Sequence, residues 1–251
     1  MNLDLFWAVQ LVTIVNPVLA GKATLLLAED AVRTDLAMKV MRLEPRDLPD
    51  APRVASVIDW MKLLLANQVP SVAMSFSRQS PQSELLGPVI HVARPNECQM
   101  WQVDVEADEE PDASGRMQNR GVLRLFGPRL GSWFSPQPVD EALDHFRTAV
   151  LSARRYSFAA LDGAFSDMFD AALKELDATR LTPAARRIMP LSVHYPTPVR
   201  NLAAALSVGW VFGGMGSWND IQGDDEYASL TDRLWSSVAD AVEAVGTAVP
   251  N

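Results

Sequence analysis

Three polar residues in the C-terminal part of the chain could perform hydrolytic chemistry: His194, Asn219 and Asp220. Imidazole and carboxylate groups are common partners in general acid–base catalysis. These residues are therefore the catalytic candidates if the protein is a hydrolase that lacks a recognisable motif. Asn219 and Asp220 belong to a glycine-rich turn, GGMGSWND, at residues 213–220.

The spacing of these candidates weakens the case for one shared catalytic site. His194 precedes a predicted helix of about 24 Å, and Asp220 follows it. Acid–base partners must approach to about 3 Å, so a straight helix would keep the two apart. The favoured interpretation of the turn is structural: Asn219 and Asp220 satisfy free backbone groups, while Trp218 covers the edge of the core.

The predicted helix spans residues 198–212 and is the element around which we expect the rest of the chain to pack. Thr197 and Pro198 are typical of a helix start. From Leu202 to Phe212 the segment is apolar apart from Ser207, and a helix that is apolar on every side must be buried. Glycines at 213 and 214 are expected to end it.

Motifs for other chemistries are missing from the sequence. It contains no P-loop, no GxSxG, no HExxH and no CxxC. The three histidines and Cys98 show no spacing typical of metal ligands. The glycines of the 213–220 turn follow a helix, whereas a dinucleotide site needs a strand before the turn. We therefore expect no cofactor and no metal site.

Composition narrows the class of partner. The 251 residues include 22 basic and 31 acidic ones, a net charge of −9. This balance argues against nucleic-acid binding and is compatible with a basic protein partner. The single cysteine, Cys98, rules out an intrachain disulfide and favours a cytoplasmic location. The apolar run at 5–15 is too short to span a bilayer and has no basic flank, so no membrane contact is expected.

The pattern of residues predicts an α+β fold. An antiparallel meander of about four strands is expected in the first half, because the apolar period changes to two there. The strands are placed at 72–76, 88–93, 99–106 and 122–126. A helical second half is expected to pack on the sheet around the buried helix. Its other helices are placed at 138–155, 157–176 and 225–248.

The domain organisation is predicted as one α+β domain, 1–251. A subdivision into 1–135, mixed and containing the sheet, and 136–251, helical, stays open. Residues 3–15 and 36–43 could each be helix or strand, because their apolar runs have no clear period.

The leading hypothesis for function is a non-enzymatic, acidic, cytoplasmic protein that binds another protein, as an inhibitor or immunity protein does. Trp133 and Phe134, in the exposed-looking segment GSWFSPQP, and Trp218 are the interface candidates. An enzyme should show a deep pocket with converging polar groups, whereas a binding protein should show an apolar patch with an acidic rim. The identity of a partner or substrate and the oligomeric state stay open.

Overall fold

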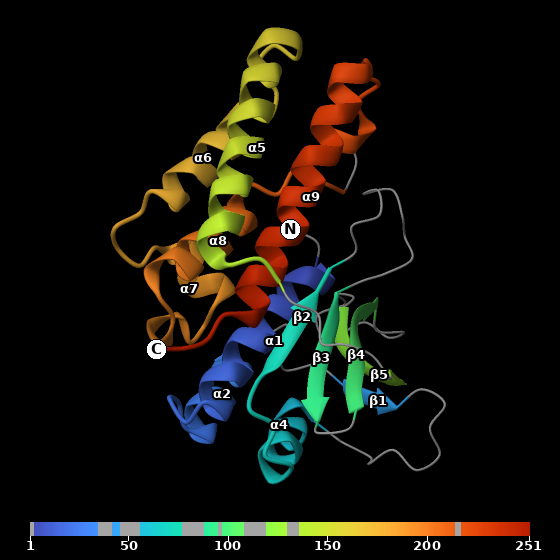
Figure 1. The fold of residues 1–251 in the computed structure, drawn as a ribbon, viewed down its shortest axis with the longest axis vertical. Coiled ribbons are helices and arrows are strands. Elements are labelled where there is room, and N and C mark those ends of the chain that lie inside the picture. The colour runs from blue at the N-terminus through green and yellow to red at the C-terminus, as the bar shows by residue number, and fades with distance from the viewer. Residues whose placement is uncertain are drawn as a thin grey trace, which may run out of the picture.

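The first half of the chain forms a sheet with helices on it, and the second half forms a group of helices beside that sheet, an α+β fold (Figure 1). A computed structural model describes residues 3–34, 42–45, 56–76, 88–94, 97–107, 119–129, 136–213 and 217–251. Buried apolar side chains from both halves belong to one continuous core.

The sheet has the strand order β1-β5-β4-β3-β2. Four of these strands form the antiparallel meander that the sequence predicts: β2 (Val72–Ser75), β3 (Val89–Arg94), β4 (Glu97–Ala107) and β5 (Asn119–Arg129). A fifth strand, β1 (Arg42–Pro45), pairs in parallel with β5. Part of the undecided segment 36–43 therefore belongs to a strand, and its first residues lie outside the described ranges.

The N-terminal segment 3–15, which was undecided, belongs to helix α1 (Leu3–Leu19). Its polar residues Gln10, Thr13 and Asn16 are 0–2% exposed and lie three residues apart, which places them on one stripe. Gln10 Nε2 donates to the carbonyl oxygen of Arg187 at 2.8 Å. Asn16 binds the backbone of β2. The buried polar stripe therefore ties α1 to both halves.

Two shorter helices lie in the described part of the first half, α2 (Leu25–Thr34) and α4 (Val57–Ala66). The Ser56 hydroxyl caps α4 by accepting from the Asp59 backbone N–H at 3.1 Å. Trp60 of α4 meets Trp101 of β4 edge-on, with ring centroids 5.7 Å apart. This contact fixes α4 against the apolar face of the sheet.

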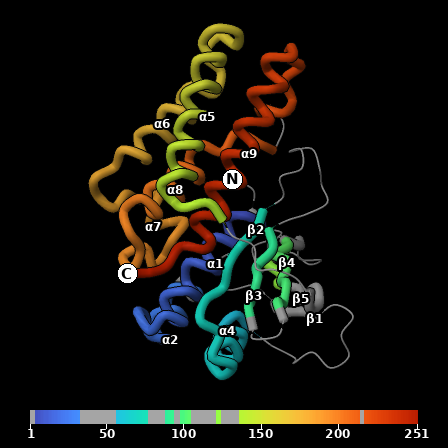
Figure 2. Tube along the Cα trace, in the orientation of Figure 1, coloured from blue at the N-terminus to red at the C-terminus, as the bar shows by residue number. Residues whose placement is uncertain are grey.

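The second half contains α5 (Val139–Ala160), α6 (Ser166–Leu176), α7 (Pro183–Ile188), α8 (Thr197–Val208) and α9 (Asp225–Thr247). Short 3₁₀ turns lie at Ser192–His194 and Trp218–Asp220. Helix α9 agrees with the predicted helix 225–248. Helices α5 and α9 lie side by side, run in opposite directions and extend past the sheet at one end (Figures 1 and 2).

Helix α8 is the predicted buried helix, but it ends at Val208 and not at residue 212. The Gly209 backbone N–H donates to Ala205 O at 2.8 Å, and the chain then leaves the helix. A Cβ atom at Gly209 would lie 2.6 Å from the Ala172 Cβ, so only glycine allows α6 to approach this closely. Val211 and Phe212 are still 4% exposed, because the segment after the helix is also buried.

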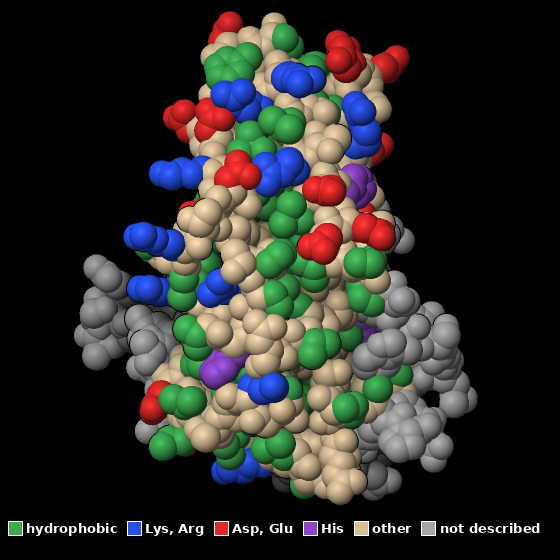
Figure 3. Space-filling view, turned by 60° about the vertical axis from the view of Figure 1, so that its left-hand side comes forward, with side chains coloured by type: hydrophobic (Ala, Val, Ile, Leu, Met, Phe, Trp, Pro, Cys, Tyr) green, Lys and Arg blue, Asp and Glu red, His purple; other side chains and the backbone are tan. Residues whose placement is uncertain are grey.

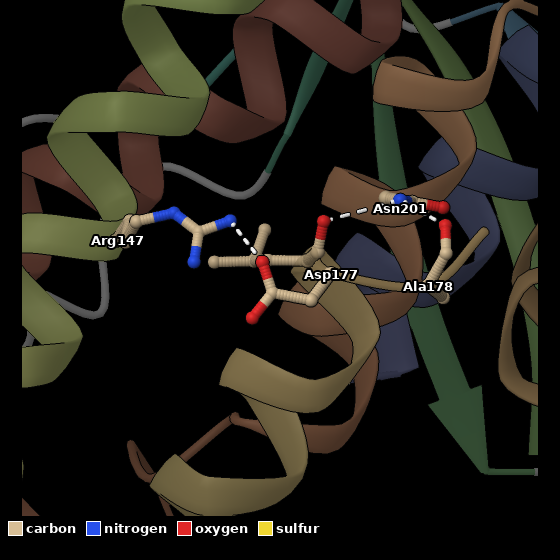
Figure 4. Close-up of polar contacts among 5 residues, drawn as sticks. Arg147, Asp177, Ala178 and Asn201 are labelled. Carbon is tan, nitrogen blue, oxygen red and sulfur yellow. Dashed lines mark hydrogen bonds and ion pairs between the residues drawn. The ribbon is translucent and has the colours of Figure 1, made fainter.

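Helix α6 is held at its C-terminal end by side chains from two neighbouring helices (Figure 4). Asn201 of α8 donates through Nδ2 to the carbonyl oxygens of Leu176 and Ala178, at 3.1 and 2.8 Å. Arg147 of α5 donates to Asp177 Oδ1 at 2.8 Å. The two bonds from Asn201 satisfy carbonyl groups that the end of a helix leaves unpaired, and the bond from Arg147 holds the side chain of Asp177.

Helix α9 joins the two halves by crossing the edge strand β2. A Cβ atom at Gly246 would lie 2.5 Å from the Met74 Cβ, so helix and strand are in direct contact there. The Glu243 carboxylate accepts from the backbone N–H of Phe76 at 3.3 Å. The Phe76 ring lies 5.2 Å from that of Trp235. Helix α9 therefore covers an edge that would otherwise be open to another strand.

Candidate functional site

The 213–220 turn uses its polar side chains to hold its own backbone. Asn219 Oδ1 accepts from the Gly213 backbone N–H at 3.1 Å and from the Ser217 hydroxyl at 2.8 Å. Asp220 Oδ2 accepts from the Ser217 backbone N–H at 2.9 Å and from its hydroxyl at 3.1 Å. These side-chain oxygens therefore face donors of the same turn. Residues 214–216 lie outside the described ranges.

Trp218 lies inside the helical half, with no exposed surface. Its indole stacks on Tyr227 at 5.1 Å between centroids and donates through Nε1 to the Thr231 hydroxyl at 2.8 Å. Three more rings contact it edge-on. They belong to Tyr156 of α5, to Phe165, which directly precedes α6, and to Phe169 of α6. Trp218 thus offers no surface to a partner and instead anchors the turn between three helices.

His194 lies far from the turn. Its carbonyl oxygen accepts from the Asn251 backbone N–H at 2.7 Å, which places it beside the C-terminus of the chain. Helix α9 begins just after the turn and ends just before that terminus, and its 23 residues span about 34 Å. The structure therefore does not bring His194 together with Asn219 and Asp220. The other two interface candidates, Trp133 and Phe134, lie outside the described residues.

The free end of the α5–α9 pair carries an open hollow of about 400 Å³. We call this region the helix-pair tip. Its apolar lining consists of Ala159 and Ala160 of α5 and Leu230 of α9. Its polar lining contains two acidic and two basic side chains as well as two hydroxyl groups: Asp224, Glu226, Arg155, Arg233, Ser152 and Tyr156. The hollow lies beside the ring cluster around Trp218, because Tyr156 belongs to both.

The chain before and at the start of α9 supplies an acidic run beside the tip. Five acidic residues occur from Asp220 to Asp232, with no basic residue among them. Acidic and basic side chains both lie at the upper end of the helical half in Figure 3. Burial, together with the carboxylates of Asp224 and Glu226, raises the pKa of Tyr156.

The acidic run is fixed in place by hydrogen bonds to the helices. Asp224 Oδ1 accepts from the Tyr227 backbone N–H at 2.9 Å and so caps α9. The same oxygen accepts from the Tyr156 hydroxyl at 3.3 Å, which ties the cap to α5. Burial raises the pKa of Tyr227 to about 12, and Tyr156 and Asp220 add to the effect. Both phenols therefore stay neutral at physiological pH.

The tip residues were not among the sequence-based candidates. Tyr227 and Leu230 are recognisable in the sequence only as members of the apolar stripe of α9. Tyr156 lies where the sequence predicts the join between two helices. The acidic run from Asp220 to Asp232 is the sequence feature that could have indicated this site. The run alone does not predict which helix packs opposite it.

Comparisons with known proteins add no functional assignment: the chain matches no protein-family model, no curated protein and no solved structure. Within the described ranges, no helix combines the length and apolar character needed to cross a bilayer. In the same part of the chain, no three His, Cys, Asp or Glu side chains gather in a way that could hold a metal ion.

Proposed function

We propose that this protein acts by binding another protein, in the manner of an inhibitor or immunity protein, and that the helix-pair tip is its docking surface. The observation that carries the proposal is the combination found there: an open hollow with an apolar part and both acidic and basic side chains at its rim, beside the acidic run at 220–232. A non-enzymatic role of this kind needs complementary shape and charge, and no reacting group.

The hollow suits one anchoring side chain of the partner. Its volume of about 400 Å³ is large enough for an aromatic or long basic side chain. Ala159, Ala160 and Leu230 supply apolar contact, while Glu226 and Asp224 can pair with a positive group at the rim. Anchors of this type, buried at the centre of an interface, contribute most of its binding free energy.

The charge of the protein favours a basic partner. The net charge of −9 attracts a basic surface over distances of about a Debye length, and the acidic run orients it toward the tip. Binding should therefore weaken as salt is added, mainly through a slower association rate.

The helix-pair tip is preorganised for binding. Trp218 fills the space between α5, α6 and α9, and the bond from Tyr156 to Asp224 joins the two sides of the hollow. A surface that is already ordered loses less conformational entropy on association.

The test is capture of a partner by the purified chain from an extract of its source, with variants that change only the tip. Ala160→Trp fills the hollow from an exposed position, and Glu226→Lys reverses a charge at its rim. Glu141→Lys makes the same charge change at the other end of α5 and is the matched control. The wild-type chain and Glu141→Lys should retain a basic partner in stoichiometric amount.

Both tip variants should weaken retention of that partner at least tenfold, and raised salt should release it from the wild-type chain. Equal retention by Ala160→Trp and wild type would show that the partner docks elsewhere. Failure to recover any stoichiometric partner would count against a binding function.

A further inference from the structure

The hollow at the helix-pair tip is elongated along both helices. Helices α5 and α9 are antiparallel, and the contact between His145 Nδ1 and Asp240 Oδ2 fixes their relative level. Seven residues are close to two turns, so steps of seven toward the tip stay on the same face of each helix. Two further facing pairs follow from these steps: Ser152 with Arg233, and Ala159 with Glu226. All four residues line the hollow, which is therefore a groove at least about 10 Å long.

The two ends of this groove carry opposite charges. Asp224 and Glu226 lie at the end nearest the tip, and Arg233 lies about 10 Å away at the other end. The side chain of Arg155 leans toward the start of α5, as helical side chains do, and so extends toward the same end as Arg233. Within the described ranges, no ion pair joins any of these four side chains to an opposite charge. The charges are therefore available to a partner.

The middle of the groove is apolar and lined by small side chains. Leu230 is 3% exposed and forms the floor, beside the half-buried ring of Tyr156. Ala159 and Ala160 are exposed on the α5 side. Small residues allow the axes of packed helices to approach to about 8 Å, so the groove can accept another helix and not just a single side chain. Along its length the groove thus reads acidic, apolar and basic.

A helix suits this groove better than an extended segment. The backbone groups of α5 and α9 pair within each helix, so a strand lying between them would find no edge to bind. A helix brings its own backbone already paired and contacts a groove through side chains at positions i, i+4 and i+7. These positions span about 10 Å, which is the distance between the two charged ends.

We propose that the docking element of the partner is an amphipathic helix with opposite charges seven positions apart, which lies along the groove as a third helix. Its basic residue faces Asp224 and Glu226, and its acidic residue faces Arg155 and Arg233. The apolar side chain between them is the anchor that fills the hollow over Leu230. This inference rests on the proposed docking function and names the kind of partner segment that the helix-pair tip binds.

The probes are three alanine-based peptides of about 18 residues, each held helical by a staple on the face away from the groove. Each has a central tryptophan between two charged residues that are seven positions apart. The charges are Glu and Lys in the mixed peptide, two Lys in the doubly basic peptide and two Glu in the doubly acidic peptide. Amide NMR spectra of the isotope-labelled full chain, recorded during titration with each peptide, give both the affinity and the location of binding.

The wild-type chain should bind the mixed peptide about tenfold more tightly than either like-charged peptide, because each of those places one charge against a like charge. The amides that shift should belong to Tyr156, Ala159 and Leu230 and their neighbours. Titration at about 0.15 M salt screens charges beyond about 8 Å, so the net charge of −9 does not by itself favour the doubly basic peptide.

Reversing the charges at one end of the groove should change which peptide is preferred. The double variant Arg155→Glu, Arg233→Glu makes both ends acidic at exposed positions, and it should bind the doubly basic peptide most tightly. Glu141→Lys, at the other end of α5, is the control and should keep the wild-type order of affinities. Circular dichroism must show both variants as helical as the wild-type chain.

The helical form of the docking element is tested with a fourth peptide. It has the charges and tryptophan of the mixed peptide, no staple, and a proline in place of an alanine between the charges, which interrupts the helix. It should bind the wild-type chain at least tenfold more weakly than the stapled mixed peptide. Equal affinity would show that the groove takes an extended segment.

Three other results would overturn the inference: equal affinity of the wild-type chain for the mixed and doubly basic peptides, an unchanged preference in the double variant, or amide shifts confined to other elements. The docking function can fail separately. If Ala160→Trp releases a captured basic partner while the peptides bind without preference, the helical inference fails and the docking function stands. If Ala160→Trp retains that partner, the helix-pair tip is not the docking surface.

Discussion

His145 of α5 and Asp240 of α9 are joined by a 2.7 Å contact between Nδ1 and Oδ2. The two residues differ in exposure: the histidine side chain is 41% exposed, whereas the aspartate side chain is 2% exposed. A carboxylate buried between helices is costly unless hydrogen bonds hold it, so His145 brings a donor from the surface to a charge that water cannot reach. This contact fixes the register of the two longest helices.

Replacing His145 with alanine should lower the free energy of unfolding by about 1–3 kcal/mol, because the buried Asp240 carboxylate loses a hydrogen-bond donor. Urea unfolding at pH 7, followed by circular dichroism, measures the change. Thr148→Ala, on the exposed part of the same helix, is the control and should change stability by no more than about 0.5 kcal/mol. An unchanged unfolding midpoint for His145→Ala would mean that the contact does not stabilise the helix pair.

Trp218→Ala should be one of the most destabilising substitutions in the chain, at about 3–5 kcal/mol, because it leaves a large cavity among four rings. Trp218→Phe keeps most of the packing and loses the bond to Thr231, so its cost should be smaller. Phe158→Ala, at a ring that is 56% exposed, serves as the comparison and should change stability little. Similar unfolding midpoints for Trp218→Ala and Phe158→Ala would contradict the anchoring role of the indole.

Asp4 should make stability depend on pH. Burial, with the Asp104 carboxylate adding to it, raises its pKa from 3.8 to about 6. Between these values the folded chain binds a proton that the unfolded chain has released, so stability falls as pH rises through this window. Asp4→Asn removes the effect and should stabilise the protein at pH 7.5 by about 1 kcal/mol, a figure reduced for screening by water.

The gain from Asp4→Asn should shrink as the pH approaches 4, where the native aspartate is already neutral in the folded state. Urea unfolding at pH 4, 6 and 7.5 gives this dependence, and Asp232→Asn, at an exposed position on α9, is the matched control. A gain for Asp4→Asn that is the same at all three pH values would point to a cause other than the ionisation of this carboxyl group.

Much of the architecture could be predicted because its signals are local. Trp101 and Val103 alternate with polar residues in β4, and Tyr227, Leu230 and Leu234 repeat at three and four in α9. Neighbouring strands of a meander follow each other in the chain, so their pairing needs no long-range information. The segment 36–43, in which strand β1 begins, stayed open between helix and strand because its partner, β5, lies about 80 residues away in the sequence.

The boundary between α5 and α6, the end of α8 and the candidate site could not be predicted, because they depend on contacts between distant segments. The join between α5 and α6 was placed at residues 155–157, yet α5 continues to Ala160. The chain turns at Asp162 and Phe165, non-glycine residues with positive φ, which no local pattern marks. The hollow at the tip exists because Tyr156 and Leu230 belong to helices that pack together. The periodicity of apolar residues predicts each helix, but it does not predict which helices pack against each other.

Asn16 should be essential to the packing of α1 against the sheet, because its side chain pairs with both the backbone N–H and the backbone carbonyl of Val72 on the edge strand β2. Its Oδ1 accepts from the Val72 N–H at 2.8 Å, and its Nδ2 donates to the Val72 carbonyl at 3.0 Å. Asn16→Ala leaves both groups buried without these partners, which should cost about 2–4 kcal/mol. Asn67→Ala removes an exposed amide that caps α4 and should cost less than about 1 kcal/mol.

Two measurements check the role of Asn16. Urea unfolding gives the loss of stability, and hydrogen exchange of the Val72 amide reports the edge directly, since exchange there should accelerate in Asn16→Ala before the core strands are affected. When warming loosens α1 from the sheet, the unpaired groups of Val72 can pair with another molecule, so this variant should aggregate on warming more readily than Asn67→Ala. If the Val72 amide exchanges at the wild-type rate in Asn16→Ala, the side chain does not protect this edge.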